Sequence, residues 1–498
     1  MIEIEIGLFQ LSGALAAVFL IYHLALAYYN ARISPLGRIP GPWYASITSI
    51  PRKYATAFQR REAHHTYNLV KQYGPFVRTG PREVIITDPA AFKEIHCIGT
   101  RFLKTDLYKY LNPTPPGQAP YGLFQTSDPS AHAARRKLLS RGFTLNSLRT
   151  HWEGTVQERI DFAMTSMQKE AKTGSEVDIF KWFPLMAGDI AATLMFGESF
   201  NMLERAKPDP MLARSGVNGG GNALAYNFPV LYQILRFVPL PAVQNMFQGN
   251  PVLLERGKIA VQNSKGASEA KNIFSRVLDE AEKDDPVLTD QETIVEAGSF
   301  LFAATDTTAT TLTFLIWSVL SNPALQKDLE TEVASLDEPF TEEKVENLPL
   351  LNAVIKETLR LYGAAPAALP RVTPPEGVTF GKYFIPGGTT VATQAWSLHR
   401  DPKIFRDPEK FDHSRWLGDL ASRDEVKAIW CPFGAGSRVC IGVHLAYMEL
   451  RLTTAAFFRQ CRGAKLALST TPESMEVENV FLIAPKSRRC KIVIRTDA

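Results

Sequence analysis

One helical stretch constrains the fold of this chain more than any other feature. Residues 289–292 fit a capping box, and the helical pattern then runs without a proline to an Asn-Pro pair at 322–323. A helix of this length measures about 45 Å at 1.5 Å per residue. It needs a large folded body around it, and 498 residues are enough to build one.

The middle of this helix is polar, which argues against a membrane span. The stretch ATDTTATT (304–311) places Asp306 among hydroxyl side chains, and a carboxylate is costly at the centre of a bilayer. We therefore predict that the helix passes through the core of a domain that is mainly α with small β-sheets. Strands are expected over residues 76–88 and 378–396, where β-branched residues alternate around glycine and proline turns.

Residues 214–250 interrupt the helical pattern. The stretch SGVNGGGN (215–222) indicates a flexible segment, and residues 228–247 are markedly apolar. The apolar segment is either a buried pair of helices or a lid or surface that dips into a membrane. The sequence leaves these two interpretations open.

The N-terminal segment differs from the rest of the chain. Residues 7–29 carry no charge and are long enough to cross a bilayer as a helix, with acidic residues before them and Arg32 and Arg38 after them. The positive flank predicts that the body faces the cytoplasm. A cleaved signal peptide fits less well, because the segment begins acidic and is long. The expected division is a lumenal N-terminus at 1–6, an anchor at 7–29, a proline-rich hinge at 30–45 and the body at 46–498.

Composition excludes some classes of protein. The net charge of +4 and the absence of zinc-finger or RNA-binding spacing argue against nucleic acid as a partner. The cysteines form no CxxC pair, which argues against a disulfide framework and favours a reducing compartment. They are Cys97, Cys431, Cys440, Cys461 and Cys490.

Cys440 lies in the glycine-rich stretch FGAGSRVCIG (433–442), directly before a helical pattern. Backbone N–H groups and the dipole at a helix N-terminus stabilise an anion and lower the pKa of a thiol. A thiolate there could be a nucleophile, a redox thiol or a metal ligand, but a nucleophile needs a base and a redox site usually needs a second cysteine. A lone thiolate can hold haem iron, because a porphyrin supplies four other ligands. An ordinary buried cysteine in a turn is the alternative.

The residues of this loop resemble a known pattern. Phe433, Gly436, Arg438, Cys440 and Gly442 reproduce FxxGxRxCxG, the haem-binding loop of the cytochrome P-450 family. The resemblance covers the whole chain and is closest to fungal microsomal members. The other similar motifs are HAARR (132–136), ATDTT (304–308, with Ala304 in place of the usual glycine), the ExxR pair Glu357 and Arg360, LPRVTP with Arg371, and PEKFDHSRW (408–416, with His413 in place of a proline).

The resemblance implies a cytochrome P-450 fold, an N-terminal transmembrane helix and a catalytic domain that binds heme b. It implies that Cys440 ligates the iron and that Phe433 shields the sulfur. His132, Arg136, Arg371 and Arg438 would neutralise the haem propionates. Asp306 and Thr307 would deliver protons on the distal side, since cleavage of O2 needs them. For Thr307 the alternative is a helix threonine that bonds its own turn. Glu357, Arg360 and Arg415 would form a buried charge network.

The function that the resemblance implies is a monooxygenase in the endoplasmic reticulum membrane. It would take electrons from NADPH through NADPH-cytochrome P-450 reductase, or from cytochrome b5, and insert one oxygen atom into an apolar small molecule. A basic face on one helix, with Arg135, Lys137 and Arg141, would dock the reductase. Substrate contacts are expected at 105–125, 228–240, 299–304, 365–369 and near Phe481.

Several alternatives remain at this stage. The enzyme could tailor fungal secondary metabolites, detoxify, or oxidise lipids or sterols. A haem-thiolate isomerase that rearranges peroxides needs neither O2 nor a reductase, and the pair at 306–307 argues against it. A non-catalytic haem sensor at the membrane is the alternative from another class.

Overall fold

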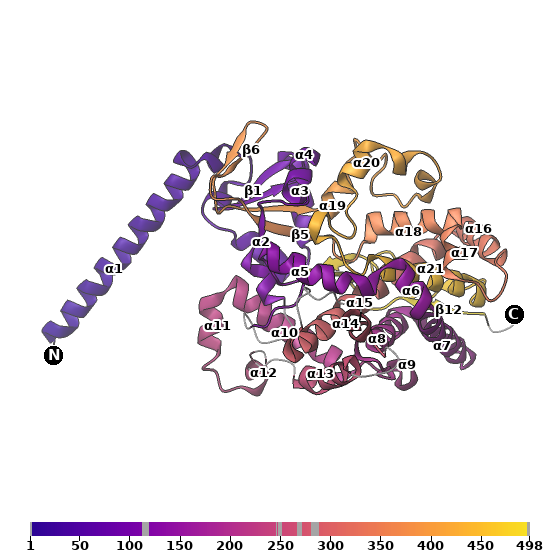
Figure 1. The fold of residues 1–498 in the computed structure, drawn as a ribbon. Helices are drawn as coiled ribbons and strands as arrows, with labels where there is room; N and C mark the ends of the chain where they lie inside the picture. Colours follow the sequence, from indigo (N-terminus) through magenta and orange to yellow (C-terminus); the bar gives the residue numbers. More distant parts are fainter. Residues whose placement is uncertain are drawn as a thin grey trace.

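The computed structural model describes residues 2–111, 119–245, 247, 251–265, 271–279 and 288–495. Figure 1 shows a mainly helical body from which helix α1 (Ile2–Tyr28) extends as a separate rod, so that the two termini lie at opposite ends of the molecule.

The predicted long helix is α15 (Asp290–Leu320), and it lies at the centre of the body (Figure 1). The Thr289 hydroxyl accepts the N–H of Glu292, and the Glu292 carboxylate accepts the N–H of Thr289, which completes the expected capping box. The helix packs most extensively on α8 (Ile179–Phe196) and also on helices from the C-terminal half. The prediction of a core helix is therefore confirmed.

The other helices surround this pair. They are α2 (Ile50–Ala57), α3 (Glu62–Tyr73), α4 (Pro89–His96), α5 (Pro129–Ser140), α6 (Leu145–His151), α7 (Glu153–Lys172), α9 (Met202–Arg205), α10 (Pro210–Asn227), α11 (Pro229–Leu235), α12 (Pro241–Gln244), α13 (Pro251–Ser264), α14 (Ile273–Asp279), α16 (Pro323–Ala334), α17 (Glu342–Glu346), α18 (Pro349–Tyr362), α19 (Ala395–Leu398), α20 (Asp424–Ile429) and α21 (Val443–Gln460).

The main sheet has five short strands in the order β1-β2-β8-β5-β3, and β2 runs parallel to β8. Its register places Lys104 of β3 opposite Arg371 of β5, which brings two distant basic residues together. The strands of this sheet are β1 (Phe76–Gly80), β2 (Glu83–Ile86), β3 (Leu103–Lys104), β5 (Ala368–Val372) and β8 (Thr390–Gln394). Two smaller sheets have two strands each: β6 (Val378–Phe380) with β7 (Tyr383–Ile385), and β10 (Val477–Asn479) with β11 (Ile483–Pro485). A further sheet has three strands in the order β4 (Val177–Asp178), β12 (Lys491–Val493) and β9 (Lys465–Leu466).

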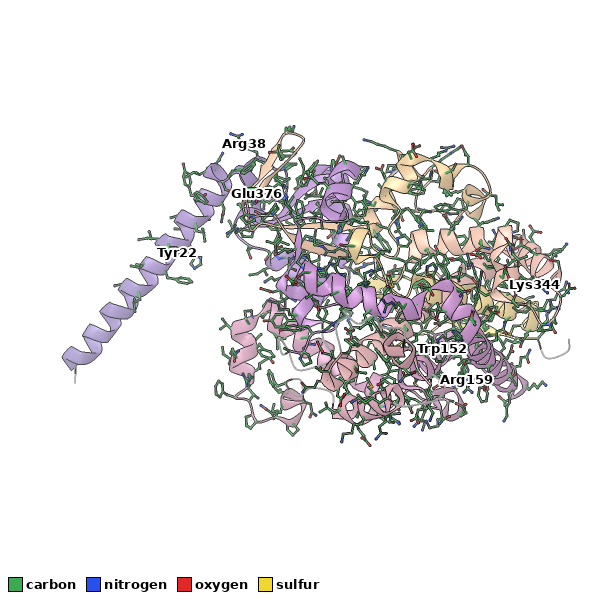
Figure 2. The ribbon with its side chains drawn as sticks, in the orientation of Figure 1. Tyr22, Arg38, Trp152, Arg159, Lys344 and Glu376 are labelled. Atoms are coloured by element: carbon green, nitrogen blue, oxygen red, sulfur yellow. The ribbon has the colours of Figure 1, made fainter. Side chains whose placement is uncertain are left out.

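The N-terminal helix makes little contact with the body. Among the described residues, two helical stretches are long and apolar enough to span a membrane. In Gly13–Ile33 the body buries 6% of the apolar window, and in Ile179–Phe196 it buries 78%. The second is a core helix, whereas Tyr22 on the first is 62% exposed and lies on the part of the helix that extends from the body (Figure 2). The proline-rich segment after it is attached to the body, since Arg78 of β1 donates its N–H to Pro40 and its guanidinium to Asn30.

The described residues of the segment at 214–250 differ from the expected flexible stretch and from one of the two interpretations of its apolar part. Residues 215–222 continue α10, so the glycines are helical. The apolar residues that follow are not a buried helix pair, because α11 has no buried residue and Phe237 is 88% exposed. Exposed apolar side chains on short helices are consistent with the other interpretation, a lid or a surface that meets a membrane.

Candidate functional site

The loop that carries Cys440 is fixed by backbone contacts. The N–H of Cys440 donates to Phe433 O at 2.9 Å, which closes the loop on itself. Gly436 has φ of +62°, and a Cβ there would lie 1.6 Å from His96 O, so only glycine fits. Cys440 precedes Gly442, the N-cap residue of α21, by two positions, as the sequence predicted.

The pKa of the Cys440 thiol is raised, whereas its position before a helix N-terminus predicted a lowered pKa. The Gly442 N–H and the Arg136 guanidinium lower the pKa of the thiol, but burial outweighs them and raises it. The side chain is nevertheless accessible, although Cys431 and Leu445 on either side of the loop are buried. An accessible thiol enclosed by protein faces an internal space. Bound metal would itself stabilise the thiolate.

One face of α15 is also accessible in the middle of the core. Ala303 and Asp306 are exposed and Thr307 is half-buried, whereas Leu301 and Thr305 on the same turns are buried. The accessible residues follow the helical period, so they form one stripe along the helix. The accessible face of α15 therefore includes Asp306 and Thr307, the two residues that the sequence analysis assigned to proton delivery.

The hydroxyl of Thr307 donates to Ala303 O, one turn earlier, at 2.6 Å. Thr305, Thr311 and Thr313 make the same bond to their own turns. The local bond therefore does not distinguish Thr307; its accessibility does. The neighbouring Asp306 has no hydrogen bond or ion pair to a described residue. Although its side chain is accessible, the protein around it desolvates the carboxyl and raises its pKa.

Several cations gather beside the Cys440 loop. Arg136 of α5 donates to Val439 O at 2.7 Å, and Arg438 donates to Thr126 O and Ser127 O at 2.7 and 3.0 Å, so these arginines join the loop to α5. Arg371 donates to the Tyr108 hydroxyl at 2.7 Å, and Lys104 donates to Phe124 O at 2.5 Å.

This cation cluster, formed by Arg136, Arg371, Arg438 and Lys104, has no counter-ion among the described residues. In the described part of the chain no carboxylate lies within ion-pair distance of any of the four, and Asp128 attracts Arg438 only from farther away. Burial and the other cations lower the pKa of Arg438 to about 10 and that of Lys104 well below its usual value. Buried cations without a carboxylate partner are costly, so the cluster is suited to an anion.

His132 was expected to neutralise a propionate, but in this structure it carries no charge at neutral pH. Burial, followed by Arg438, Lys104 and Arg136, lowers the pKa of His132 to about 3. A neutral imidazole can still donate an N–H to a carboxylate, and such an anion would raise its pKa.

These residues fit a haem. A thiol that faces an internal space can ligate iron, and the uncompensated cations match the two negative charges of the propionates. Phe433 is half-buried, with its ring 5.3 Å from that of Tyr447. The sequence analysis assigned no role to Lys104 and placed Tyr108 only within the expected substrate range 105–125, since neither residue belongs to a motif. Only the pairing of β3 with β5 brings them beside Arg371.

The basic face expected on α5 is wrong for one of its members. Arg135 forms ion pairs with Glu292 and Glu296 of α15, and its side chain is 16% exposed. Lys137 is exposed and Arg141 is half-buried. Since Arg135 faces the core helix, it cannot help to form a docking surface.

The charge network predicted around Glu357 is confirmed. Arg360 donates to both carboxylate oxygens of Glu357 at 2.8 Å, and Arg415 and Trp416 donate to the same carboxylate at 3.3 and 2.8 Å. The remaining N–H groups of Arg360 reach backbone carbonyls, including that of His399. Every charge in this network has a partner, so its role is structural.

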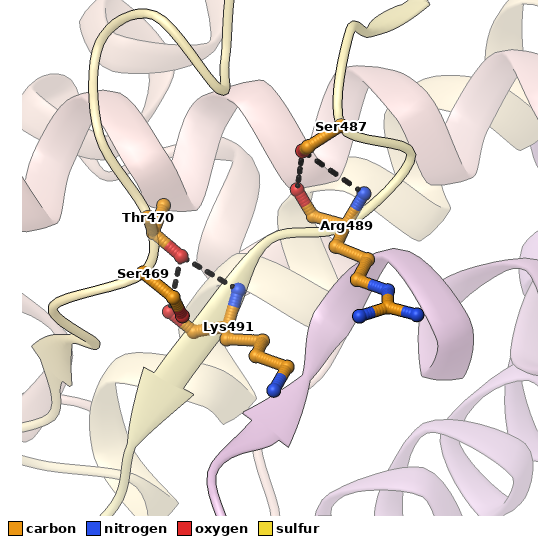
Figure 3. A pocket seen from close by; sticks show the side chains of 5 residues that line it. All are labelled: Ser469, Thr470, Ser487, Arg489 and Lys491. Carbon is orange, nitrogen blue, oxygen red and sulfur yellow. Dashed lines mark hydrogen bonds between the residues drawn. The ribbon is translucent and has the colours of Figure 1, made fainter.

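A hollow of about 310 Å³ lies in the C-terminal region (Figure 3). Its polar groups bond one another: Ser487 Oγ donates to Arg489 O, and Thr470 Oγ1 donates to Lys491 O and accepts the N–H of Lys491. None of the predicted site residues lines it, so it has no part in the candidate site.

Comparisons with known proteins agree with this geometry. The family model for cytochrome P-450 matches residues 45–492. The chain is 41% identical to the cytochrome P-450 monooxygenase stcB of Emericella nidulans, over 95% of this chain and 90% of that protein. It is 40% identical to the cytochrome P-450 monooxygenase aflV of Aspergillus parasiticus, over 96% and 95%. It is 33% identical to the methylphloroacetophenone oxidase of Cladonia uncialis, over 80% and 90%.

Proposed function

The chain belongs to the cytochrome P-450 family, and on that premise we propose that this haem-thiolate monooxygenase inserts one oxygen atom from O2 into an apolar organic substrate at a membrane. Haem bound through a cysteine thiolate supplies the activation of O2. The observation that carries the proposal is the cation cluster, which has no carboxylate partner in the described part of the chain and is bonded directly to the loop of an accessible cysteine. Hydroxylation is the default outcome, with epoxidation and desaturation as variants.

Individual roles follow from the contacts of each residue. Cys440 Sγ would ligate the iron, and Phe433 would cover the sulfur. Arg136, Arg371 and Arg438 would bind the propionates, and His132 would donate an N–H to them. Each arginine keeps its present backbone or tyrosine bond with one part of the guanidinium, which leaves other N–H groups for the carboxylates.

The ligand assignment is tested by Cys440→Ala. We expect the reduced wild-type protein to show, with carbon monoxide, the absorption band that marks thiolate ligation, and the variant to lack it. Cys97→Ala, which removes an exposed cysteine outside the loop, is the control. If Cys440→Ala keeps the band, the assignment is wrong.

Thr307 and Asp306 handle protons on the accessible face of α15. The two side chains leave the helix about 100° apart, so they cannot both face the same point. Thr307 Oγ1 would hold a proton on the accessible face of α15, and the raised pKa of Asp306 favours uptake of a proton from solvent.

Thr307→Ala should leave cofactor and substrate binding nearly intact but divert reducing equivalents into hydrogen peroxide. Loss of a proton donor costs a factor of about 10²–10⁴ where proton transfer limits the rate. The measurement is the ratio of product to NADPH consumed, with Thr305→Ala as the control from the buried side of the helix. Unchanged coupling in Thr307→Ala contradicts this role. Rearrangement of an organic hydroperoxide by a wild type that forms no product with NADPH would favour the isomerase.

The membrane assignment combines α1 with an apolar face on the body. Lys53 of α2 donates to Asn227 O at 3.0 Å, which joins the two halves of this face. In Figure 1, α1, α2 and α11 lie on the same side of the molecule. We assign the protein to the endoplasmic reticulum as a single-pass protein with a cytoplasmic body. The exposed side chains of the apolar face are Trp43, Ile47, Ile50, Tyr54, Phe58, Val230, Leu231, Ile234, Phe237 and Leu240.

Deletion of residues 1–38 tests this arrangement. The full chain should stay in the membrane pellet through a carbonate wash. The truncated protein should pellet less, and the fraction that still pellets should be held by the apolar face. Adding Phe237→Asp should remove that remainder, whereas Phe384→Asp, outside this face, should not. Protection of the body from protease in sealed microsomes would contradict the topology.

Electron transfer and pathway extend the proposal further. The family requires a redox partner, and we assign NADPH-cytochrome P-450 reductase, with cytochrome b5 as a second donor. One fungal relative is, by its name, an oxidase of methylphloroacetophenone. The ring of Phe124 contacts two other rings, with its centroid 5.4 Å from that of Tyr108 and 6.2 Å from that of Phe481. Such a group of aromatic rings suits an aromatic substrate. Both observations favour secondary-metabolite biosynthesis. NADPH oxidation with purified reductase, dependent on added substrate, is the measurement.

A further inference from the structure

The apolar face of the body carries charge of one sign. Its exposed side chains come from two segments, residues 30–61 and 210–254, and neither segment contains an Asp or a Glu. The whole chain has nearly as many acidic residues (51) as basic ones (55), so this imbalance is local. The basic residues of the two segments are Arg32, Arg38, Arg52, Lys53, Arg60, Arg61, Arg214 and Arg236.

Acidic residues from other segments pair with two of these cations in the described part of the chain. Glu83 pairs with Arg52 at 2.9 Å, and Glu476 pairs with Arg61 at 3.4 Å. No described carboxylate lies within ion-pair distance of the remaining described side chains, of which Lys53 is half-buried and the others are exposed. These side chains form the basic rim, which consists of Arg32, Arg38, Lys53, Arg60 and Arg236.

The basic rim borders the exposed apolar side chains. Arg236 is the C-cap residue of α11 and directly precedes Phe237, which is 88% exposed. At the other end of the face, Arg32 directly precedes Ile33, which is 62% exposed. Apolar side chains bordered by Lys and Arg are typical of a surface that lies in a membrane interface.

The two segments that carry the rim are joined to each other. Lys53 Nζ donates to Asn227 O at 3.0 Å and lies 5.8 Å from the centroid of the Phe228 ring. An ammonium group has three N–H donors, so this bond leaves others available. Glu376, which lies on the side of the body where α1 joins it (Figure 2), is already paired with Arg101. The rim is therefore one surface with N–H donors left for an outside partner.

The position of α1 identifies that partner. In Figure 1, α1, α2 and α11 lie on the same side of the molecule, so a membrane that holds α1 also meets the apolar face. Lys and Arg side chains near a bilayer are attracted to anionic headgroups, whereas zwitterionic headgroups carry no net charge to attract them. We propose that the basic rim binds anionic phospholipid headgroups and thereby holds the apolar face in the interface. This inference rests on the proposed membrane assignment and adds the class of lipid.

The test measures which lipids lie against the full-length, haem-loaded protein. The protein is reconstituted in phosphatidylcholine vesicles that contain a trace of spin-labelled phosphatidylserine, or of phosphatidylcholine with the same label on the same acyl chain. The motionally restricted fraction in the electron paramagnetic resonance spectrum gives the relative affinity of each lipid. We expect phosphatidylserine to be preferred about threefold or more at low salt. The preference should shrink in 1 M salt, where the Debye length is about 3 Å.

The decisive variant combines Arg60→Gln with Arg236→Gln, which removes rim cations of the body and leaves the basic flank of α1 intact. We expect it to lose half or more of the preference for phosphatidylserine. The matched control combines Lys403→Gln with Arg406→Gln, two exposed cations in the loop after α19, and should keep the wild-type preference. The carbon monoxide band of each variant shows that it is folded and loaded with haem.

Equal affinity for the two lipids in the wild type would overturn the proposal. A preference that survives unchanged in the Arg60→Gln, Arg236→Gln variant would also overturn it, because the flank of α1 alone would then explain the selectivity. Failure of the membrane assignment gives a different result. A wild-type protein that leaves the membrane pellet in a carbonate wash is not anchored, whereas one that stays in the pellet and shows no lipid preference has only the rim assigned wrongly.

Discussion

Two groups of arginines, each with buried and half-buried members, have opposite electrostatic balance in this protein. In the closed network, Arg360 and Arg415 share the carboxylate of Glu357, and the remaining donors of Arg360 reach backbone carbonyls. In the cation cluster, Arg371 and Arg438 bond only to neutral groups, and no described carboxylate pairs with them. The first group is complete within the chain, whereas the second has no anion among the residues that the structure describes.

The difference distinguishes a structural charge from a binding charge. Removing one member of a complete buried pair leaves the other uncompensated, which is costly whether or not a ligand is present. Removing one member of a group of like charges relieves repulsion until the ligand binds. The two groups should therefore respond to substitution with opposite signs in the ligand-free protein.

The largest effect is expected for Glu357→Ala, which strands Arg360 at zero exposure. We expect the free energy of unfolding to fall by about 3–5 kcal/mol, in both the haem-free and the haem-loaded protein. Glu376→Ala removes the exposed partner of Arg101 (Figure 2) and should cost about 0–1 kcal/mol. Denaturant unfolding of both variants makes the comparison, and equal losses would refute the distinction.

A smaller effect of opposite sign is expected for Arg371→Met in the cation cluster. In the haem-free protein the unfolding midpoint should stay the same or rise, because one of several like charges is gone. In the loaded protein haem should dissociate about tenfold faster, which corresponds to about 1.4 kcal/mol. Transfer of haem to an acceptor protein gives the rate. A loss of stability in the haem-free protein as large as that of Glu357→Ala would place Arg371 in the structural class.

The smallest effect concerns pH and separates His132 from His399. Burial, followed by nearby arginines, lowers the pKa of each to about 3 from an ordinary value of 6.5. The unfolded chain therefore binds more protons between these values, and the stability present above pH 6.5 is lost as pH falls toward 3. The buried His96 and the half-buried His64 and His65 contribute with the same sign.

A bound propionate should raise the pKa of His132 but not that of His399, whose Nε2 accepts the N–H of Cys431. The haem-loaded protein should thus lose less stability than the haem-free protein as the pH falls. His132→Gln should remove this difference and His399→Gln should keep it. Unfolding midpoints from pH 7 to 5 provide the measurement, and a difference that survives His132→Gln would exclude His132 from the anion site.

The sequence by itself determined the elements whose causes are local. The capping box at Thr289 and the Asn-Pro pair at 322–323 mark the ends of α15, and the spacing of Glu357 and Arg360 puts them on one face of α18. The position of Cys440 before α21 was also readable, since glycines and a following helical period suffice to predict it. The family resemblance added the roles of these residues.

The tertiary structure decided whatever depends on residues far apart in the chain. Lys104 and Tyr108 join Arg371 only through the β3–β5 register, and Arg135 turns from the expected surface toward Glu292 because α5 packs near α15. The pKa of Cys440 is likewise set by burial, which no local pattern reports. Electrostatic energies in a core depend on desolvation and on all nearby charges, so they exist only once distant segments have packed.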